Sequence, residues 1–322
     1  DFCLSRGLGD VYKRQELLCQ QALSSAEKLL GAEHPRVATS LHNMAKLYHT
    51  QGKYSEAETL YQRALAIREK RVNPFLAETC DGLALLYFEQ GRYTEAELFF
   101  QRALTFRENV LGLEHPDIAD SLNNLGKLYS KQGKYTEAES LLQRALTLRE
   151  KTLGTEHPLI AMNLNSLGEL YYKQARYIEV EPLLQRSLAI NERILGPEHR
   201  EVAINFINLG NLFFQQGKYA EAEPLYQQAI SIFKKALGPQ HPFVAVGLNN
   251  LGTIYIYQNK YTEAKLFLQQ AINIREKALG PEHADLAESL NSLGELYCKQ
   301  GKYVVAEPLY QRALTIREKA LG

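Results

Sequence analysis

The sequence contains no tryptophan and only four cysteines among 322 residues. Cys3, Cys19, Cys80 and Cys298 lie far apart and form no C-x-x-C pair, so the spacing indicates neither a zinc site nor a redox pair. We interpret these thiols as reduced and mostly packed side chains. Cysteine usage of this kind favours the cytoplasm.

The chain also lacks an excess of charge and long apolar runs. Lys+Arg and Asp+Glu number 37 each, so no positive excess is available for a phosphate backbone, and we do not expect nucleic-acid binding. No apolar run approaches the roughly 20 residues needed to cross a bilayer, and no basic start followed by an apolar segment indicates a secretion signal. We therefore expect a soluble protein that makes no membrane contact.

Motifs for catalysis are missing as well. The sequence has no Ser/His/Asp arrangement, phosphate-binding glycine loop or H-E-x-x-H motif. Pairs of glutamates such as Glu137 and Glu139 fall at predicted helix starts, where carboxylates favour the helix dipole. We expect no enzyme activity, no cofactor and no metal in this segment.

A short unit repeats along the chain. Leu-Gly recurs through the sequence, and the five intervals from Gly112 to Gly322 are each 42 residues. Such a period is typical of solenoids. The glycines of this series are Gly31, Gly112, Gly154, Gly196, Gly238, Gly280 and Gly322.

Each unit is predicted to form a pair of helices. In residues 113–154, Ile118, Leu122, Leu125 and Tyr129 keep helical spacing and predict a first helix, helix A. Gly133 is then expected to end helix A in a left-handed conformation. Residues 136–139 (T-E-A-E) have the pattern of a capping box, with the Thr136 hydroxyl as N-cap of a second helix, helix B.

Six of the eight histidines occupy one position, just before helix A. Equivalent loops of stacked repeats lie about 10 Å apart if helices pack at their usual distance, whereas the ligands of one zinc ion each lie about 2 Å from it. We therefore interpret these histidines as loop residues that satisfy helix-end groups. They are His34, His115, His157, His199, His241 and His283.

The order of small and large residues around Leu122, Gly126, Ala138 and Ala145 resembles the tetratricopeptide repeat (TPR). Several recurring segments resemble the kinesin light chain type of that family, which is also widespread in bacterial proteins. They are H-P, L-N-N-L-G, Q-G-K-Y, E-A-E and R-A-L-x-x-R-E-K. The resemblance covers about residues 15 to 322 and implies an all-α, right-handed TPR superhelix of antiparallel helix pairs. We expect a fragment of bacterial or environmental origin.

Repeat boundaries follow from the spacing. Residues 1–14 match no part of the unit, and we interpret them as an artefact or disordered leader. Residues 15–31 predict a half repeat with helix B only. Repeat 4 lacks the glycine between its helices, where Ala175 stands, and we expect it to be the softest unit. The seven predicted TPR units are 32–73, 74–112, 113–154, 155–196, 197–238, 239–280 and 281–322.

One face of helix A carries the functional prediction. Residues two positions beyond the buried stripe are rotated by about 200° and are expected to point away from the core. This face is wholly polar in repeat 3 but turns apolar in repeats 4 to 6, and in TPR arrays it lines the concave groove. The predicted groove residues are Asn124, Lys127, Lys131, Met162, Asn165, Tyr172, Lys173, Ile204, Ile207, Asn208, Asn211, Phe214, Val246, Asn249, Asn250, Ile256 and Tyr257.

Two functions remain open at this point. The first is a protein-interaction scaffold that binds a peptide or partner segment in the groove, where the amides are suited to contact a main chain and the apolar residues an aromatic or leucine anchor. Lys127, Lys131 and Lys173 favour acidic flanking residues, and kinesin light chain arrays accept such peptides. The alternative is a structural spacer or oligomerisation arm of a larger signalling protein, with self-association through uncapped ends.

Overall fold

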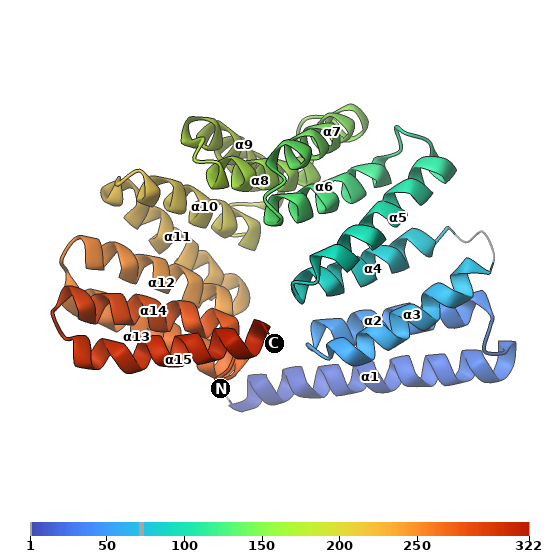
Figure 1. The fold of residues 1–322 in the computed structure, drawn as a ribbon, viewed down its shortest axis with the longest axis horizontal. Coiled ribbons are helices and arrows are strands. Elements are labelled where there is room, and N and C mark those ends of the chain that lie inside the picture. The colour runs from blue at the N-terminus through green and yellow to red at the C-terminus, as the bar shows by residue number, and fades with distance from the viewer. Residues whose placement is uncertain (1, 71–73, 322) are drawn as a thin grey trace. The chain divides into compact units, whose positions relative to one another are not determined.

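The computed structural model describes residues 2–70 and 74–321, with side chains from 14 to 319 outside that gap. These residues form fifteen α-helices and no strand. The helices gather into two compact units, Asp1–Thr152 and Leu153–Gly322. Figure 1 shows the helices of each unit as successive antiparallel pairs.

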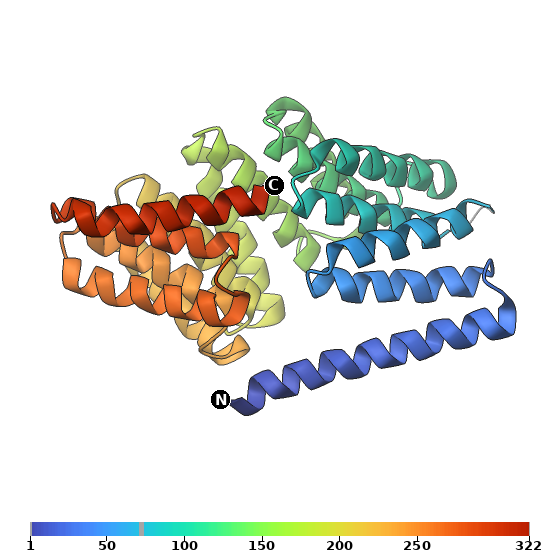
Figure 2. The same cartoon turned by 60° about the horizontal axis from the view of Figure 1, so that its bottom comes forward.

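The first unit begins with a long helix, α1. It is continuous from Phe2 to Leu30, so the backbone of residues 2–14 is helical where a disordered leader was expected. Asp1 and the side chains of residues 2–13 lie outside the described part. Helix α1 lies alongside α2 (Figure 2). The other helices of this unit are α2 (Pro35–Thr50), α3 (Tyr54–Glu69), α4 (Leu76–Glu89), α5 (Tyr93–Leu111), α6 (Pro116–Lys131) and α7 (Tyr135–Leu153).

The second unit continues the same alternation. Each even-numbered helix is a helix A of 16 residues and each odd-numbered helix is a helix B of 19 residues. The helices are α8 (Pro158–Lys173), α9 (Tyr177–Leu195), α10 (Arg200–Gln215), α11 (Tyr219–Leu237), α12 (Pro242–Tyr257), α13 (Tyr261–Leu279), α14 (Ala284–Lys299) and α15 (Tyr303–Leu321).

Close approach of helices A and B depends on small residues. A Cβ added at Gly126 of α6 would lie 2.8 Å from Cγ of Leu142 and 3.3 Å from the carbonyl oxygen of Ala138, both on α7. Ala138 and Ala145 are fully buried in the same contact. The hairpin therefore packs at a distance that only glycine and alanine permit at these positions.

The six loop histidines cap helix A. Each ring has its Nδ1 3.2 Å from the backbone nitrogen two residues later, and that N–H donates to Nδ1. An accepting Nδ1 requires the neutral imidazole with its proton on Nε2. These bonds satisfy helix-end N–H groups as predicted. No group of His, Cys, Asp or Glu side chains suited to a metal ion occurs in the described residues.

The predicted capping box of helix B is wrong. Helix α3 begins at Tyr54, one residue before Ser55, and its N-cap Lys53 makes no side-chain capping bond. Helix α7 likewise begins at Tyr135, so Thr136 lies inside the helix. Because the helix starts earlier than the hydroxyl, Glu56 and Glu137 still lie in the first turn, where they favour the dipole.

Repeat 4 carries local strain at its missing glycine. Ala175, between α8 and α9, has φ 58°, and Asn259 has φ 60° at the same point of repeat 6. A left-handed conformation costs a residue with a Cβ about 1–2 kcal/mol, and asparagine tolerates it better than alanine. That repeat 4 is the softest unit stays a prediction.

Candidate functional site

The apolar surface of the second unit centres on one position of helix A, here called the outer position. It holds Met162 on α8, Ile204 on α10 and Val246 on α12. Met162 is 38% exposed, while Ile204 and Val246 are half-buried and pack on the core cluster of this unit. Three successive helices therefore present aliphatic side chains at the same register.

Aromatic rings extend this surface at the ends of the same helices. The ring centroids of Phe214, Tyr219 and Tyr257 lie 5.4 to 5.7 Å from one another, so the three rings form one contact group. Tyr257 is 44% exposed. Tyr172 makes a separate edge contact with Tyr177 at 5.6 Å. Rings held by each other are rigid contacts for a ligand.

The amide side chains are partly engaged with each other. Asn211 Oδ1 accepts hydrogen bonds from the Tyr226 hydroxyl, at 2.7 Å, and from Asn250 Nδ2, at 3.0 Å. Asn165 Oδ1 accepts from Nδ2 of Asn205, at 3.0 Å. Asn208 is half-buried, and its side chain makes no hydrogen bond within the described residues. The donor and acceptor groups of the Asn208 side chain are therefore not used by other described residues.

Three predicted groove residues are buried, which corrects their assignment to an open face. Ile207 and Asn249 are 8% and 3% exposed, and Ile256 is 1% exposed within the core cluster. The position of Ile207 faces the next helix A, since a Cβ added at Gly247 would lie 3.7 Å from Ile207 Cδ1. These three side chains are therefore part of the interior beneath the apolar surface.

In the first unit the predicted polar face is only partly exposed. Lys127 and Lys131 on α6 are exposed and Asn124 is half-buried, but their neighbours Asn123 and Ser130 are buried. In the second unit, Lys173 Nζ lies 3.0 Å from a carboxylate oxygen of Glu169, so its charge is balanced locally.

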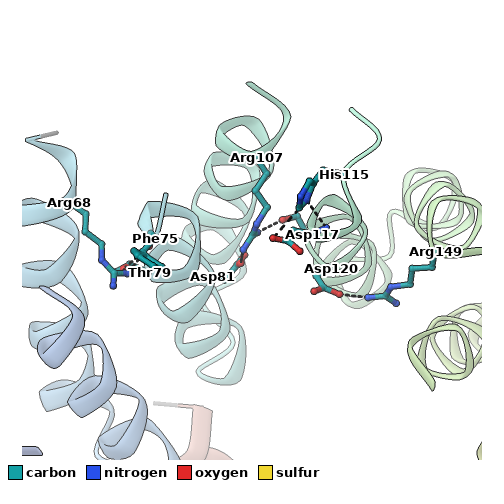
Figure 3. A network of polar contacts seen from close by, with 10 residues as sticks. Arg68, Phe75, Thr79, Asp81, Arg107, His115, Asp117, Asp120 and Arg149 are labelled. Carbon is teal, nitrogen blue, oxygen red and sulfur yellow. Dashed lines mark hydrogen bonds and ion pairs between the residues drawn. The ribbon is translucent and has the colours of Figure 1, made fainter. Parts of the chain in front are cut away.

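Sequence reasoning missed a series of buried arginines at one position of helix B, here called the interior position. The arginines are Arg68, Arg107, Arg149 and Arg275. Arg68 donates to the Phe75 carbonyl at 2.6 Å and also to the Thr79 hydroxyl. Arg107 donates to Asp81 at 2.5 Å, and Figure 3 shows both contacts. Burial lowers the pKa of Arg68, and burial raises the pKa of Asp81 although Arg107 opposes it.

Two more arginines of the series reach the outer position. Arg149 is 1% exposed and pairs with Asp120 of its own repeat (Figure 3). Arg275 donates to Glu288 at 2.8 Å and to the Ser289 hydroxyl at 2.7 Å. A buried guanidinium requires such partners because an unpaired buried charge is strongly destabilising.

The series is interrupted where the surface turns apolar. Repeats 4 and 5 have Asn191 and Phe233 at the interior position, and both are buried. Asn191 Nδ2 donates to Asn205 Oδ1 at 2.7 Å, within an uncharged network. The outer residues of these two repeats, Met162 and Ile204, are the first that are not acidic after Asp120. Repeats 4 and 5 thus lack both the interior charge and the outer acid, whereas repeat 6 keeps Arg275 but has Val246 at the outer position.

Family comparison agrees with this architecture. The profile of the family described as Tetratricopeptide repeat matches residues 2–70, 76–151, 129–193, 159–235, 201–277 and 267–319. The chain belongs to the tetratricopeptide repeat family. TPR proteins in general are non-enzymatic scaffolds that mediate protein–protein interactions, and they bind protein partners.

Comparison with solved structures indicates which type of TPR this chain contains. The chain is 26% identical to BtubC (BKLC) from P. vanneervenii, with a TM-score of 0.56 over 73% of this chain and 91% of that one. It is 28% identical to a Podosopora anserina protein described as a putative kinesin light chain with nearly identical TPR-like repeats, with a TM-score of 0.52 over 64% of this chain and 98% of that one. The repeats are therefore kinesin light chain-like.

A third structure shares the fold alone. The apo form of the quorum sensor NprR from B. thuringiensis is 16% identical, with a TM-score of 0.71 over 95% of this chain and 84% of that one. A comparison with curated proteins finds no match. Across the described helices, none is both long and apolar enough for a membrane span.

Proposed function

We propose that this TPR chain binds an extended segment of a partner protein across α8, α10 and α12 of its second unit. The observation that carries the proposal is the apolar surface of Met162, Ile204 and Val246, which ends at the ring group around Tyr257. Exposed apolar surface with a polar rim is typical of protein-binding sites.

The roles of the residues follow from their surroundings. The unbonded amide of Asn208 offers both a donor and an acceptor to the main chain of the bound segment. Phe214 and Tyr257 receive an aromatic or leucine anchor, because rigid rings bury large area at low entropic cost. Acidic residues flanking the anchor are attracted by Lys299, whose Nζ lies 5.7 Å from the centroid of the Tyr257 ring. Kinesin light chain-like relatives make a cargo-type peptide the first class to test.

The experiment is a random-peptide display selection on the whole chain, followed by affinity measurements on one selected peptide. We expect Phe214→Ala, Asn208→Ala and Tyr257→Ala each to weaken binding by about 1–3 kcal/mol, which is about 5- to 150-fold. Leu266→Ala serves as the control, since Leu266 is 54% exposed on α13, a helix that carries none of the residues of this surface. Circular dichroism checks that each variant stays helical.

The alternative is a structural spacer or oligomerisation arm. It replaces the proposal if selection yields no binders, or if the binders respond to Leu266→Ala as strongly as to Phe214→Ala. Crosslinking that recovers only second copies of this chain also favours the arm.

A further inference from the structure

Neighbouring repeats are joined by a carboxylate at the fifth residue of helix B. Glu97 of α5 accepts hydrogen bonds from the Tyr129 hydroxyl, Gln132 Nε2 and Lys134 Nζ, each at 3.0 Å. The three donors come from the end of α6 and the turn that follows it. One glutamate thus satisfies three polar groups of the next repeat.

The same arrangement recurs between repeats 5 and 6. Glu223 of α11 accepts from the Tyr255 hydroxyl at 2.7 Å and from Gln258 Nε2 at 3.4 Å. Gln227, one turn along α11, donates to Glu223 at 3.2 Å. Equivalent Gln-to-Glu bonds occur in the other repeats that have glutamate at this position, for example Gln101 to Glu97 at 3.1 Å.

Repeat 6 departs from this series. Lys265 of α13 stands 42 residues after Glu223, while the donors are kept: Gln269, Tyr297, Gln300 and Lys302 each follow their repeat 5 counterparts by 42 residues. In the described part of the chain, these five side chains make no hydrogen bond. In other repeats the equivalent donors surround a carboxylate. In repeat 6 they have no such carboxylate, and the ammonium group of Lys265 stands at its position in the repeat.

We infer that Lys265, Tyr297, Gln300 and Lys302 form a binding site for a carboxylate side chain of a partner protein. This inference rests on the proposed function for its source of ligand. A carboxylate is the occupant that the same donor set holds in repeats 2 and 5, and two ammonium groups favour an anion. The whole chain has no net charge, so attraction of an acidic segment here is local.

The site lies in the repeat that follows the ring group of the proposed binding surface. Tyr297 lies in α14, and Lys299 of the same helix has its Nζ 5.7 Å from the centroid of the Tyr257 ring, which belongs to that group. Because Tyr297 and Lys299 are two residues apart, they lie on different faces of α14. The carboxylate site is therefore distinct from the apolar surface.

The first test needs no ligand. Lys265→Glu restores the residue found in repeats 2 and 5, and we expect thermal melts to show a higher Tm because the carboxylate accepts from Tyr297, Gln300 and Lys302. Lys277→Glu makes the same charge change at an exposed position of the same helix, but in the last turn, where the dipole favours lysine. The control for the Tm is therefore Lys265→Glu in a Tyr297→Phe background. If Lys265→Glu raises the Tm as much in that background as in the natural chain, the donors do not converge and the inference is wrong.

The second test measures binding of a fluorescently labelled hexaglutamate peptide to the whole chain by anisotropy at low salt. We expect Lys265→Glu to weaken binding about tenfold, the loss of one charge-assisted contact, and Lys277→Glu to change it less than about twofold. Equal effects of the two variants would overturn the site. Hexaglutamate reports on this site even if Phe214→Ala shows that the apolar surface binds nothing, so the two proposals fail separately.

Discussion

The His241 cap predicts that acid destabilises this fold at the start of α12. Protonation of Nδ1 removes the acceptor for the backbone N–H and places a positive charge at a helix N-terminus, which the dipole disfavours. We consider the replacement of His241 by asparagine. Asparagine is a strong N-cap that does not titrate, so the variant keeps the cap and loses its pH dependence.

The magnitude follows from the worth of one cap. One cap contributes about 1 kcal/mol, so the loss at His241 between pH 7.5 and 5.5 is at most about 1 kcal/mol. With about 2.1 cal/mol/K of unfolding entropy per residue over 322 residues, this corresponds to about 1–2 °C in Tm.

His241 gives the sign of this pH dependence. Burial, and then the charge of Arg200, lower the pKa of His241 in the fold. The unfolded chain therefore binds the proton first, and the contribution of His241 is present above the ordinary histidine pKa of about 6.5 and lost as pH falls below it. Circular dichroism melts at pH 7.5 and 5.5 measure this loss in the natural chain and in the variant.

The other seven histidines remain in both proteins, so their contributions cancel from the comparison. An equal drop in Tm for the natural chain and for His241→Asn would refute the capping argument.

Three further outcomes are expected. Gly126→Leu destabilises by about 1–3 kcal/mol in urea unfolding because its side chain meets Leu142, whereas adjacent Lys127→Ala changes stability little. Equal losses would contradict the packing assignment. Ala175→Gly stabilises by about 1 kcal/mol by relieving the φ of 58°, and Asn259→Gly gains less in the same measurement. Asp120→Asn destabilises by leaving the Arg149 guanidinium without its carboxylate, and Asp120→Asn with Arg149→Met recovers part of the loss in thermal melts.

Much of this fold is predictable because the repeat presents the same information several times. The spacing of Leu122, Leu125 and Tyr129 predicts helix A, and left-handed glycines such as Gly133, with φ 78°, end the helices as expected. The position of the loop histidines in six of the seven repeats also predicts their helix-end role. Because the unit recurs, a weak local pattern in one repeat can be compared with the same positions in the others.

Burial on the groove face is harder to predict from a single helix. The position of Ile207 and Asn249 lies two residues from the buried stripe, and periodicity alone assigns it to solvent. The next helix A covers it, and this contact involves residues about 40 apart in sequence. Arg107 and Arg275 were missed because arginine is usually exposed. A signal exists in the hydroxyl residue 14 positions later, Ser121 or Ser289.

The residue at the outer position depends on whether the adjacent interior positions carry an arginine. An outer residue lies between the interior position of its own repeat and that of the preceding one, as the pairs Arg149–Asp120 and Arg275–Glu288 show. Ile204 lies between Asn191 and Phe233, neither of which carries a charge. A carboxylate there has no guanidinium to neutralise, so an aliphatic side chain loses nothing by replacing it. The arginine series of the interior position is therefore interrupted beneath the centre of the surface proposed for partner binding. The uncharged core at this point is what permits an aliphatic residue such as Ile204.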